Sequence, residues 1–562
     1  MATHRIQSIE GTTQHRRPVR APHLLLGVLV AVALVAAACG SSSKASNTAT
    51  TTAAAADGGT PVDGGSLVIG IGAETNGWNP ALAQWADTGS LVGSSVLEPL
   101  ASVGEDAGAK PFLADSWIAN DSFTQWFIKL HPGVKFHDGT PFDAAAVKKN
   151  IDYYKTGTLS GIALSPVIGD TTVQDPLTVV VNTKQPWAAF PNSFMTGGSS
   201  FMMAPSMIDN PTDHGASHPI GTGPYVFDSW TPDASFKAVK NANYWQPGLP
   251  HLDSIEFRVI PDETTRANAL KSGDVNMIYT TRASDANDMS NDYQVVKDWT
   301  TEQSFVMTNT APTVGGKPNP LSNIHARQAL AYATNATQVA AGIGDGVQIP
   351  SSMWSPPSPW AMPPDQNGAL TMDLDKAKQE VAAYKTDTGA ASLDVDLSGL
   401  PNIDDTKVLQ QLDSQWKDVG INVTIDSLEQ TAYITKIATG NYQAAFFRNY
   451  GYADPDANYY FFSSTTAKGA GQVSINFTEF WTTQTDQDLT TGRTSGYPNI
   501  RKQAYDDLVH QINASATNIW LYSTPYSLIA DNHVHGLATA QKVPFGNFMP
   551  KTWLGNLWRA QS

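Results

Sequence analysis

The stretch KPFLADSWIANDSFTQWFIKLHPGVKFHDGTPFDAAAVKKNIDYY, Lys110 to Tyr154, places a strand, a turn and a helix in succession. In its middle, residues 123–130 (FTQWFIKL) alternate between two faces, which predicts a half-buried strand. The side chains expected on the buried face are Trp126, Ile128 and Leu130. Asp138–Gly139 then predicts a turn between extended segments.

A helix is predicted to follow this turn. Asp143 can cap it, because a side-chain carboxylate accepts hydrogen bonds from the first N–H groups of a helix. The run AAAVKKNIDYY after the cap has helical spacing. Phe142 before the cap and Val147 inside the helix would form a hydrophobic staple. The residues expected on the buried face are Val147, Ile151 and Tyr154.

Strand and helix patterns mix along the rest of the chain. SLVIGIG (66–72) predicts a buried strand, and helical spacing starts at His325, Asp404 and Tyr497. The second of these helices is expected to end at Gly420, before the alternating strand INVTIDSL. A mixed chain of 562 residues predicts two or three domains of α/β or α+β class.

The composition argues against several functions. One cysteine in 562 residues excludes an internal disulfide framework and a cysteine-rich metal site. A formal charge of −16 makes nucleic acid a poor partner. The GxSxG, HExxH and GxxxxGKS/T patterns are missing, and the histidines show no metal-ligand spacing. The sequence therefore predicts neither an enzyme nor a bound cofactor.

The N-terminus predicts export and anchoring. Three arginines precede 15 apolar residues, Leu24 to Ala38, a pattern typical of a signal peptide over 1–38. The run is shorter than the roughly 20 residues of a membrane-spanning helix. Cys39 follows three alanines, which resembles the lipobox of bacterial lipoproteins, whose cysteine receives a diacylglyceryl group. Residues 39–65 then form the lipidated cysteine and a flexible Ser/Thr/Ala/Gly-rich tether.

Two alternatives to this interpretation of the N-terminus stay open. One is an uncleaved membrane anchor, and the other is an ordinary secreted protein with a free thiol at Cys39. Arg16–Arg17 leaves open whether export uses the twin-arginine or the general route.

The opening stretch, with EPLASVG before it, resembles the family 5 solute-binding proteins of ABC importers, the oligopeptide- and dipeptide-binding group. Further runs resemble the family in the expected order over residues 66–562. They are HPIGTGPYVF (218–227), NANYWQPGLPHLDSIEFRVIPDETTRANALKSGDVN (241–276) and ARQALAYATN (326–335).

The resemblance implies an α/β fold, a two-lobed periplasmic-binding-protein-like clamp of type II, cluster C, with an extra domain in the first lobe. Lobe 1 (domain I) would comprise residues 66–100, 216–306 and 521–562. The extra domain II would comprise 101–215, and lobe 2 (domain III) would comprise 307–520.

The implied function is to capture a peptide-like solute outside the cell and deliver it to a permease with its ATPase. The protein would be a monomer, held at the outer face of the cytoplasmic membrane by its lipid. Two lobes can close around a solute by hinge motion, and no covalent step is required.

Three stretches that follow strands are the candidate ligand site at the lobe junction. Their candidate residues are Asn76, Trp78 and Asn79; Trp354; and Asn449, Tyr450, Tyr452 and Asp454. Each aromatic residue could equally pack in the core. In peptide-binding members of the family, an Asp in a G-W-x-x-D-Y-x-D-P stretch pairs with the α-amino group of the ligand. Here the stretch is shortened to GYADPD, and Asp454 aligns with its Asp-Pro and not with the amine-binding Asp, so the resemblance does not imply recognition of a free peptide N-terminus.

Other functions stay open at this point. Within the family, the solute could be an oligosaccharide or a metal chelate, and many aromatic residues suit stacking on sugars. From other classes, a secreted hydrolase would need a nucleophile–base pair that the motifs do not supply, and a surface adhesin would need no small ligand.

Overall fold

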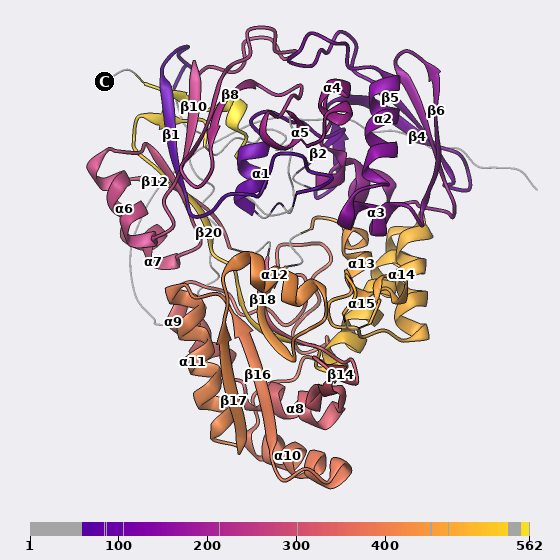
Figure 1. Ribbon diagram of the computed structural model, residues 1–562, viewed down its shortest axis with the longest axis vertical. Helices are drawn as coiled ribbons and strands as arrows, with labels where there is room; N and C mark the ends of the chain where they lie inside the picture. Colours follow the sequence, from indigo (N-terminus) through magenta and orange to yellow (C-terminus); the bar gives the residue numbers. More distant parts are fainter. Residues whose placement is uncertain are drawn as a thin grey trace, which may run out of the picture. The chain divides into compact units, whose positions relative to one another are not determined.

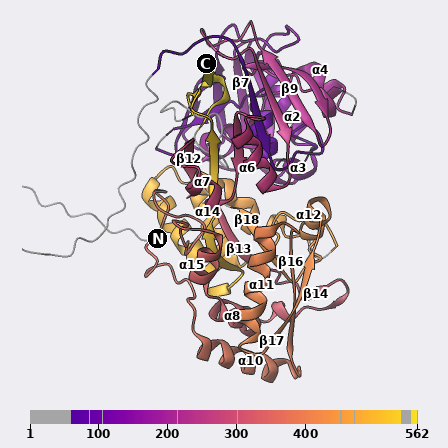
Figure 2. The same cartoon turned by 90° about the vertical axis from the view of Figure 1, so that its left-hand side faces the viewer.

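A computed structural model describes residues 59–83, 85, 87–104, 106–212, 214–299, 302–449, 452–469, 471–537 and 552–560 (Figures 1 and 2). They all fall within one structural unit, Ala54–Ser562. The expected signal peptide, Cys39, most of the tether and Tyr450 lie outside the described residues. Among the helices that are described, none combines the length and the apolar character needed to span a membrane.

The first lobe is built on a seven-stranded mixed sheet with the order β12-β20-β11-β1-β10-β9-β8. Its strands are β1 (Ser66–Ile71), β8 (Tyr225–Thr231), β9 (Ser235–Lys240), β10 (Ser254–Val259), β11 (Met277–Thr280), β12 (Gln294–Asp298) and β20 (Tyr526–Ala530). The central strand β1 is parallel to both neighbours. Helix α6 (Glu263–Ser272) packs against β11, and helix α7 (Ala283–Asp288) packs against β20.

A smaller antiparallel sheet belongs to the same lobe. Its order is β4-β5-β7-β6, from β4 (Ala114–Ala119), β5 (Gln125–Leu130), β6 (Ile168–Asp175) and β7 (Thr178–Thr183). Helix α2 (Ala144–Tyr154) packs against β6 and β7. One hydrophobic core contains residues of both sheets, so this region is joined to the first lobe by apolar packing.

The second lobe is a five-stranded sheet with helices on both faces. The order is β17-β16-β18-β13-β19, from β13 (Gln303–Thr308), β16 (Leu393–Gly399), β17 (Ile421–Ser427), β18 (Ala444–Asn449) and β19 (Asn518–Ser523). Along β13, Phe305 and Met307 face one hydrophobic core and Val306 faces the other. This alternation is the two-residue period of a strand buried on both sides.

The helices of the second lobe divide between those two cores. One core contains residues of α8 (Ile324–Ala333), α9 (Ala336–Ile343), α10 (Leu374–Thr388) and α11 (Ile403–Lys417), with α9 and α11 beside the strands in Figure 1. The other contains residues of α12 (Gln430–Ala438), α13 (Tyr459–Phe462), α14 (Thr483–Thr494) and α15 (Pro498–Ser515).

Several short elements complete the described chain. They are α1 (Asp87–Gly93), α3 (Thr158–Leu164), α4 (Pro205–Asp209), α5 (His214–Ser217), the π-turn η1 (Pro191–Met195), the 3₁₀ turns η2 (Gly198–Ser200), η3 (Pro320–Ser322), η4 (Pro455–Asn458), η5 (Ser464–Thr466) and η6 (Leu554–Asn556), and the two-stranded pairs β2 (Ala101–Val103) with β3 (Ala109–Pro111), β14 (Thr313–Val314) with β15 (Lys317–Pro318), and β21 (Val534–His535) with β22 (Trp558–Arg559).

The chain passes directly between the two large sheets at two places. Strand β12 ends at Asp298 and β13 begins at Gln303, while β19 ends at Ser523 and β20 begins at Tyr526. Residues 303–306 and 521–523, which the sequence placed in the first lobe, therefore belong to the sheet of the second. The two passages lie side by side, because Gln303 pairs with Ser523 in the second sheet.

The local predictions for the opening stretch are confirmed. Strand β5 buries Trp126, Ile128 and Leu130, and the N–H of Ala146 donates to the Asp143 carboxylate over 2.9 Å at the start of α2. Gly139 has a φ of 83°, as the turn requires. The helical pattern from His325 instead forms two helices, because Asn335 caps α9 by accepting a hydrogen bond from the N–H of Gln338.

Three of the quoted motifs meet at one buried carboxylate, Glu98. It accepts hydrogen bonds from Thr222 Oγ1 (2.8 Å), Tyr244 Oη (2.5 Å) and Trp245 Nε1 (3.0 Å). Burial raises its pKa to about 7. The two glycines of GTGPYV serve the same junction, since a Cβ on Gly221 would lie 2.1 Å from the carbonyl oxygen of Val96. The run thus packs closely on the chain at Val96 and Leu97.

Candidate functional site

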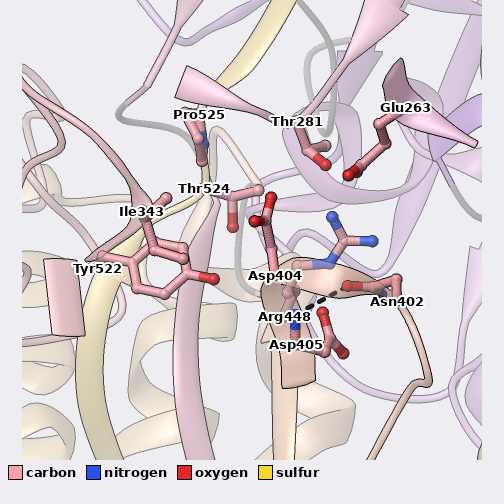
Figure 3. A pocket seen from close by; sticks show the side chains of 10 residues that line it. All are labelled: Glu263, Thr281, Ile343, Asn402, Asp404, Asp405, Arg448, Tyr522, Thr524 and Pro525. Carbon is pink, nitrogen blue, oxygen red and sulfur yellow. Dashed lines mark hydrogen bonds between the residues drawn. The ribbon is translucent and has the colours of Figure 1, made fainter. Parts of the chain in front are cut away.

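A small cavity of about 60 Å³ lies where the two lobes and the second passage meet (Figure 3). The first lobe contributes the start of α6 and the residue after β11, and the second lobe contributes the start of α11, the end of α9 and strands β18 and β19. The lining residues are Glu263, Thr281, Ile343, Asn402, Asp404, Asp405, Arg448, Tyr522, Thr524 and Pro525. A solute bound here would contact both lobes, as closure around a ligand demands.

Arg448 is the cationic residue of this lining. It lies in β18 opposite Ser304 and is only partly exposed. Among the described residues, its guanidinium is affected by neighbouring charges and makes no close hydrogen bond or ion pair. Burial alone would lower its pKa, but surrounding negative groups outweigh that effect and raise it. The groups that raise it are the hydroxyl of Tyr526 and the carboxyl groups of Glu302, Asp87 and Asp405.

Three carboxylates share the cavity with this guanidinium. Burial raises the pKa of Asp405, and burial together with the neighbouring Asp404 raises the pKa of Glu263. Glu263 has only a loose ion pair, 3.8 Å from Arg282, and Asp404 lies 3.3 Å from the exposed Lys407. The cavity therefore presents negative charge and one fixed cation, an arrangement suited to a solute that carries both signs.

A second polar group lies beside the cavity at the lobe passages. The hydroxyl of Tyr526 donates to the buried Glu302, and burial raises the pKa of Glu302 to about 7. Tyr526 stacks on Tyr279, with the ring centroids 5.8 Å apart. Tyr279 in turn donates to Asp87 Oδ2 over 2.6 Å. These contacts connect the two passages to β11 and α1 of the first lobe.

The structure places the first predicted stretch partly in the core. Trp78 is fully buried among Trp85, Trp230 and Phe236, with its ring 4.6 Å from that of Phe236. Asn79 is buried and bonds within its own turn and to Tyr153, whereas Asn76 is exposed. Their role in ligand binding stays a prediction.

The other predicted residues lie in the second lobe. Trp354 is 5% exposed and packs at 6.0 Å, edge to face, on Tyr505. Asn449 ends β18 and is buried, one residue beyond Arg448. Tyr452 lies near Phe461, and burial, with a smaller effect of the charge on Glu302, raises its pKa. Asn449 and Tyr452 therefore flank the charged group, and their contact with a solute stays a prediction.

The carboxylate of Asp454 already has hydrogen-bond partners within the protein, and its role in ligand binding stays a prediction. It is 2% exposed, and Arg501 donates to Oδ1 over 2.6 Å while Asn192 donates to Oδ2 over 3.2 Å. Its Oδ1 also accepts the N–H of Asp456. Both oxygens are thus already occupied within the protein.

Sequence reasoning missed the charged residues of the cavity. Arg448 stands in the strand AAFFRN beside apolar neighbours, and a charge at such a position is a signal that could have identified it. Glu263, Asp404 and Asp405 stand at helix starts, where acidic residues are common for capping reasons alone. Only the fold shows that these helix starts face the same cavity.

Among curated proteins, the glutathione-binding protein GsiB of Escherichia coli K12 is 31% identical to this chain over 297 residues. That match covers 52% of this chain and 56% of the relative, so the chain spans about half the length of the curated relatives it matches.

Solved structures show the same fold. The periplasmic binding protein DppA of Helicobacter pylori, in complex with the peptide STSA, superimposes with a TM-score of 0.77 at 21% identity, over 89% of this chain and 99% of that one. AgaA of A. tumefaciens R10, in complex with agropinic acid, superimposes with a TM-score of 0.78 at 22% identity, again over 89% and 99%. The family description "bacterial extracellular solute-binding proteins, family 5 Middle" matches residues 108–470, and the chain belongs to this family.

Proposed function

We propose that this protein is the extracytoplasmic substrate-binding component of an ABC importer, which captures a peptide-like solute between its lobes and delivers it to the permease. The observation that carries the proposal is Arg448. Its guanidinium lines a cavity shared by both lobes, and nearby acidic groups raise its pKa although no hydrogen bond or ion pair joins it to another described residue. A fixed, partly desolvated guanidinium is the group proteins use to hold a carboxylate.

The charges around Arg448 favour a solute with an acidic and a basic group. The carboxylate of a peptide would pair with Arg448, and an ammonium group would lie near Glu263 and Asp404. The names of related proteins support this class, since they include a glutathione-binding protein and complexes with STSA and Met-Leu. A metal chelate is the second candidate, because one similar structure holds Ni(L-His).

A binding screen tests the proposal. The probes are glutathione, Ser-Thr-Ser-Ala, Met-Leu, nickel–histidine and a cello-oligosaccharide, measured by thermal shift and then by calorimetry. A probe at 100 times its Kd stabilises the fold by about 2.7 kcal/mol, which is readily seen in the melting temperature. We expect a carboxylate-bearing probe to give the largest shift. Stabilisation by the sugar alone would overturn the proposal.

Closure would occur at the two lobe passages. The sequence predicts domain I as residues 66–100, 216–306 and 521–562, domain II as 101–215 and domain III as 307–520. We propose this division with the two domain I–III borders moved to the passages, between Asp298 and Gln303 and between Ser523 and Tyr526. Short passages between rigid sheets are where a hinge motion is absorbed. The solute shifts the open–closed balance by contacting both lobes, and binding and release need no covalent step, so the protein would act as a non-enzymatic, monomeric receptor.

The proposal extends to the location of the protein. Residues 1–38 would direct export, and a diacylglyceryl group on Cys39 would hold the protein at the outer face of the membrane. Two or more acyl chains make a stable anchor where one would be marginal. The tether would leave the lobes free to reach the permease.

A further inference from the structure

Residues 187–193 of the first lobe contact the second lobe through hydrogen bonds to one buried carboxylate. Trp187 Nε1 donates to Asp456 Oδ2 over 2.6 Å, and the hydroxyl of Ser193 donates to the same oxygen over 2.7 Å. Asp456 is fully buried and Trp187 is 2% exposed. Hydrogen bonds to an ionised acceptor are roughly twice as strong as those between neutral groups.

A second carboxylate and a backbone carbonyl extend the same contact. Asn192 Nδ2 donates to Asp454 Oδ2 over 3.2 Å, and the N–H of Ala189 donates to the carbonyl oxygen of Arg493 over 3.3 Å. The donors therefore come from the first lobe and the acceptors from the second.

The second lobe neutralises both carboxylates by itself. Arg493 Nε donates to Asp456 Oδ1 over 2.7 Å, and Arg501 donates to Asp454 Oδ1 over 2.6 Å. The guanidinium of Arg493 also lies 3.6 Å from the ring centroid of Tyr459, a cation–π contact. If the lobes separated, each carboxylate would keep its arginine on Oδ1. The two Oδ2 atoms and their neutral donors would be rehydrated, and the cation–π contact of Arg493 with Trp187, 4.7 Å to the ring centroid, would be lost. Such a contact can break without leaving an unpaired buried charge, which would be far more costly.

Each side of the contact is fixed in its own lobe. Trp187, Phe190 and Met195 belong to the hydrophobic core that joins the small sheet to the first lobe. Tyr459 and Leu489, next to the two carboxylates and Arg493, belong to a core of the second lobe. The hydrogen bonds between the two sides must therefore break when the lobes separate.

The geometry points to a latch: Trp187, Asn192 and Ser193 of the first lobe bind Asp454 and Asp456 of the second in the closed state and release them on opening. The inference rests on the proposed function in one respect, that the lobes open and close. The latch sets the fraction of the protein that is closed before a solute binds. If the solute binds the closed form, a larger closed fraction strengthens the apparent affinity. If the solute enters only the open form, a larger closed fraction weakens it.

The test measures the lobe separation of the full chain without any solute. Cys39 is the only cysteine in the chain, so a Cys39→Ala background accepts labels at cysteines replacing Val173 and Met372, which are 44% and 46% exposed. Single-molecule energy transfer then gives the short-distance and long-distance populations. The variants are Asn192→Asp and Ser193→Ala. Asn192→Asp keeps the side-chain oxygen that accepts a hydrogen bond from the N–H of Ala109. It also places a negative charge beside Asp454.

We expect each variant to lower the ratio of the short-distance to the long-distance population about ten-fold or more. Thr196→Val is the matched control, because within the described residues the Thr196 hydroxyl donates to the carbonyl of Asn192 on the same turn and to nothing in the second lobe. Its distribution should equal that of the wild type. Near-ultraviolet circular dichroism shows whether each variant is folded. If Asn192→Asp does not fold, the result for Ser193→Ala decides the test. Distributions that match the wild type in both variants, or a wild type with only the long distance, overturn the latch. Because no solute is used, a failed solute screen leaves this result unaffected.

Discussion

The hydroxyl of Thr222 donates to Glu98 Oε2 over 2.8 Å, which joins two motifs 124 positions apart in the chain. Tyr244 and Trp245, from a third motif, donate to the same carboxylate. A buried carboxylate is stable only with such partners, so the three motifs specify one junction of the first lobe. Their shared contact with Glu98 is a packing requirement of this lobe.

Glu98 makes the stability of the fold depend on pH. Burial raises its pKa from 4.5 to about 7, so the folded protein keeps a proton that the unfolded chain releases near pH 4.5. Its contribution to stability is present below pH 4.5 and falls as the pH rises to 7. Glu98→Gln carries no such proton. The free energy of unfolding of the variant, relative to wild type, should therefore rise by roughly 3 kcal/mol between pH 5 and pH 8 in urea titrations.

Thr222→Val gives the opposite trend and serves as the control. It removes a donor that favours the ionised form of Glu98, so this variant should lose more stability at pH 8 than at pH 5. Parallel curves for the wild type and Glu98→Gln across this range would show that Glu98 does not titrate there.

Local patterns predicted the elements of the opening stretch, and the fold supplied what those patterns do not contain. The alternation of β5 and the Asp143 cap depend on neighbours within a few residues, so they were predicted correctly. The three donors to Glu98 come from distant segments, and no spacing rule relates them. For the same reason the position of the lobe passages differed by a few residues from the expected one.

The candidate site shows the same limit. Arg448 is distinguished by its place in a cavity lined by both lobes and by the acidic groups around it, and both are tertiary properties. Asp454 and Trp78 were chosen for residue type and position after strands, and the structure gives them buried partners within the protein. Residue type identifies a side chain able to bind a ligand, but only packing shows whether it is already engaged.

Gly221 should resist any side chain. A Cβ there would lie 2.1 Å from the Val96 carbonyl oxygen and 2.9 Å from the Cα of Leu97, so the backbones must separate. Gly221→Ala should lower the free energy of unfolding by at least about 2 kcal/mol, measured by urea titration. Gly198→Ala is the control, since a Cβ there meets no atom within 4 Å and should change stability by less than about 0.5 kcal/mol. Equal effects at the two positions would contradict the packing argument.

Trp78→Ala separates a core role from a ligand role. The indole is fully buried against three aromatic rings, so its loss should lower the free energy of unfolding by about 3–5 kcal/mol. Trp481→Ala, at a position 50% exposed, should change it by less than about 0.5 kcal/mol. If Trp78→Ala left stability unchanged and removed solute binding, Trp78 would be part of the ligand site instead.

The single cysteine predicts where the protein is found. Cys39→Ala removes the sulfur that would receive the diacylglyceryl group, so the protein should move from the membrane pellet to the medium or the cell-wall fraction. Fractionation and immunoblotting measure this distribution. Ser41→Ala, which leaves Cys39 in place, should stay with the membrane. Retention of Cys39→Ala at the membrane would argue against lipid anchoring.

Arg448 gives the sharpest test of solute recognition. Arg448→Met removes the charge but keeps an apolar stem, so a carboxylate-bearing probe such as Met-Leu should lose affinity by about 1.5–3 kcal/mol, which is roughly ten-fold to over a hundred-fold in Kd by calorimetry. Arg448→Lys should restore part of this, because an ammonium keeps the charge without the planar fork. Arg258→Met, at a surface ion pair with Glu256, should leave Kd unchanged. Equal Kd values for Arg448→Met and wild type would show that the carboxylate of the solute binds elsewhere. Removing the cation that contacts a desolvated carboxylate leaves that charge unpaired, which weakens binding.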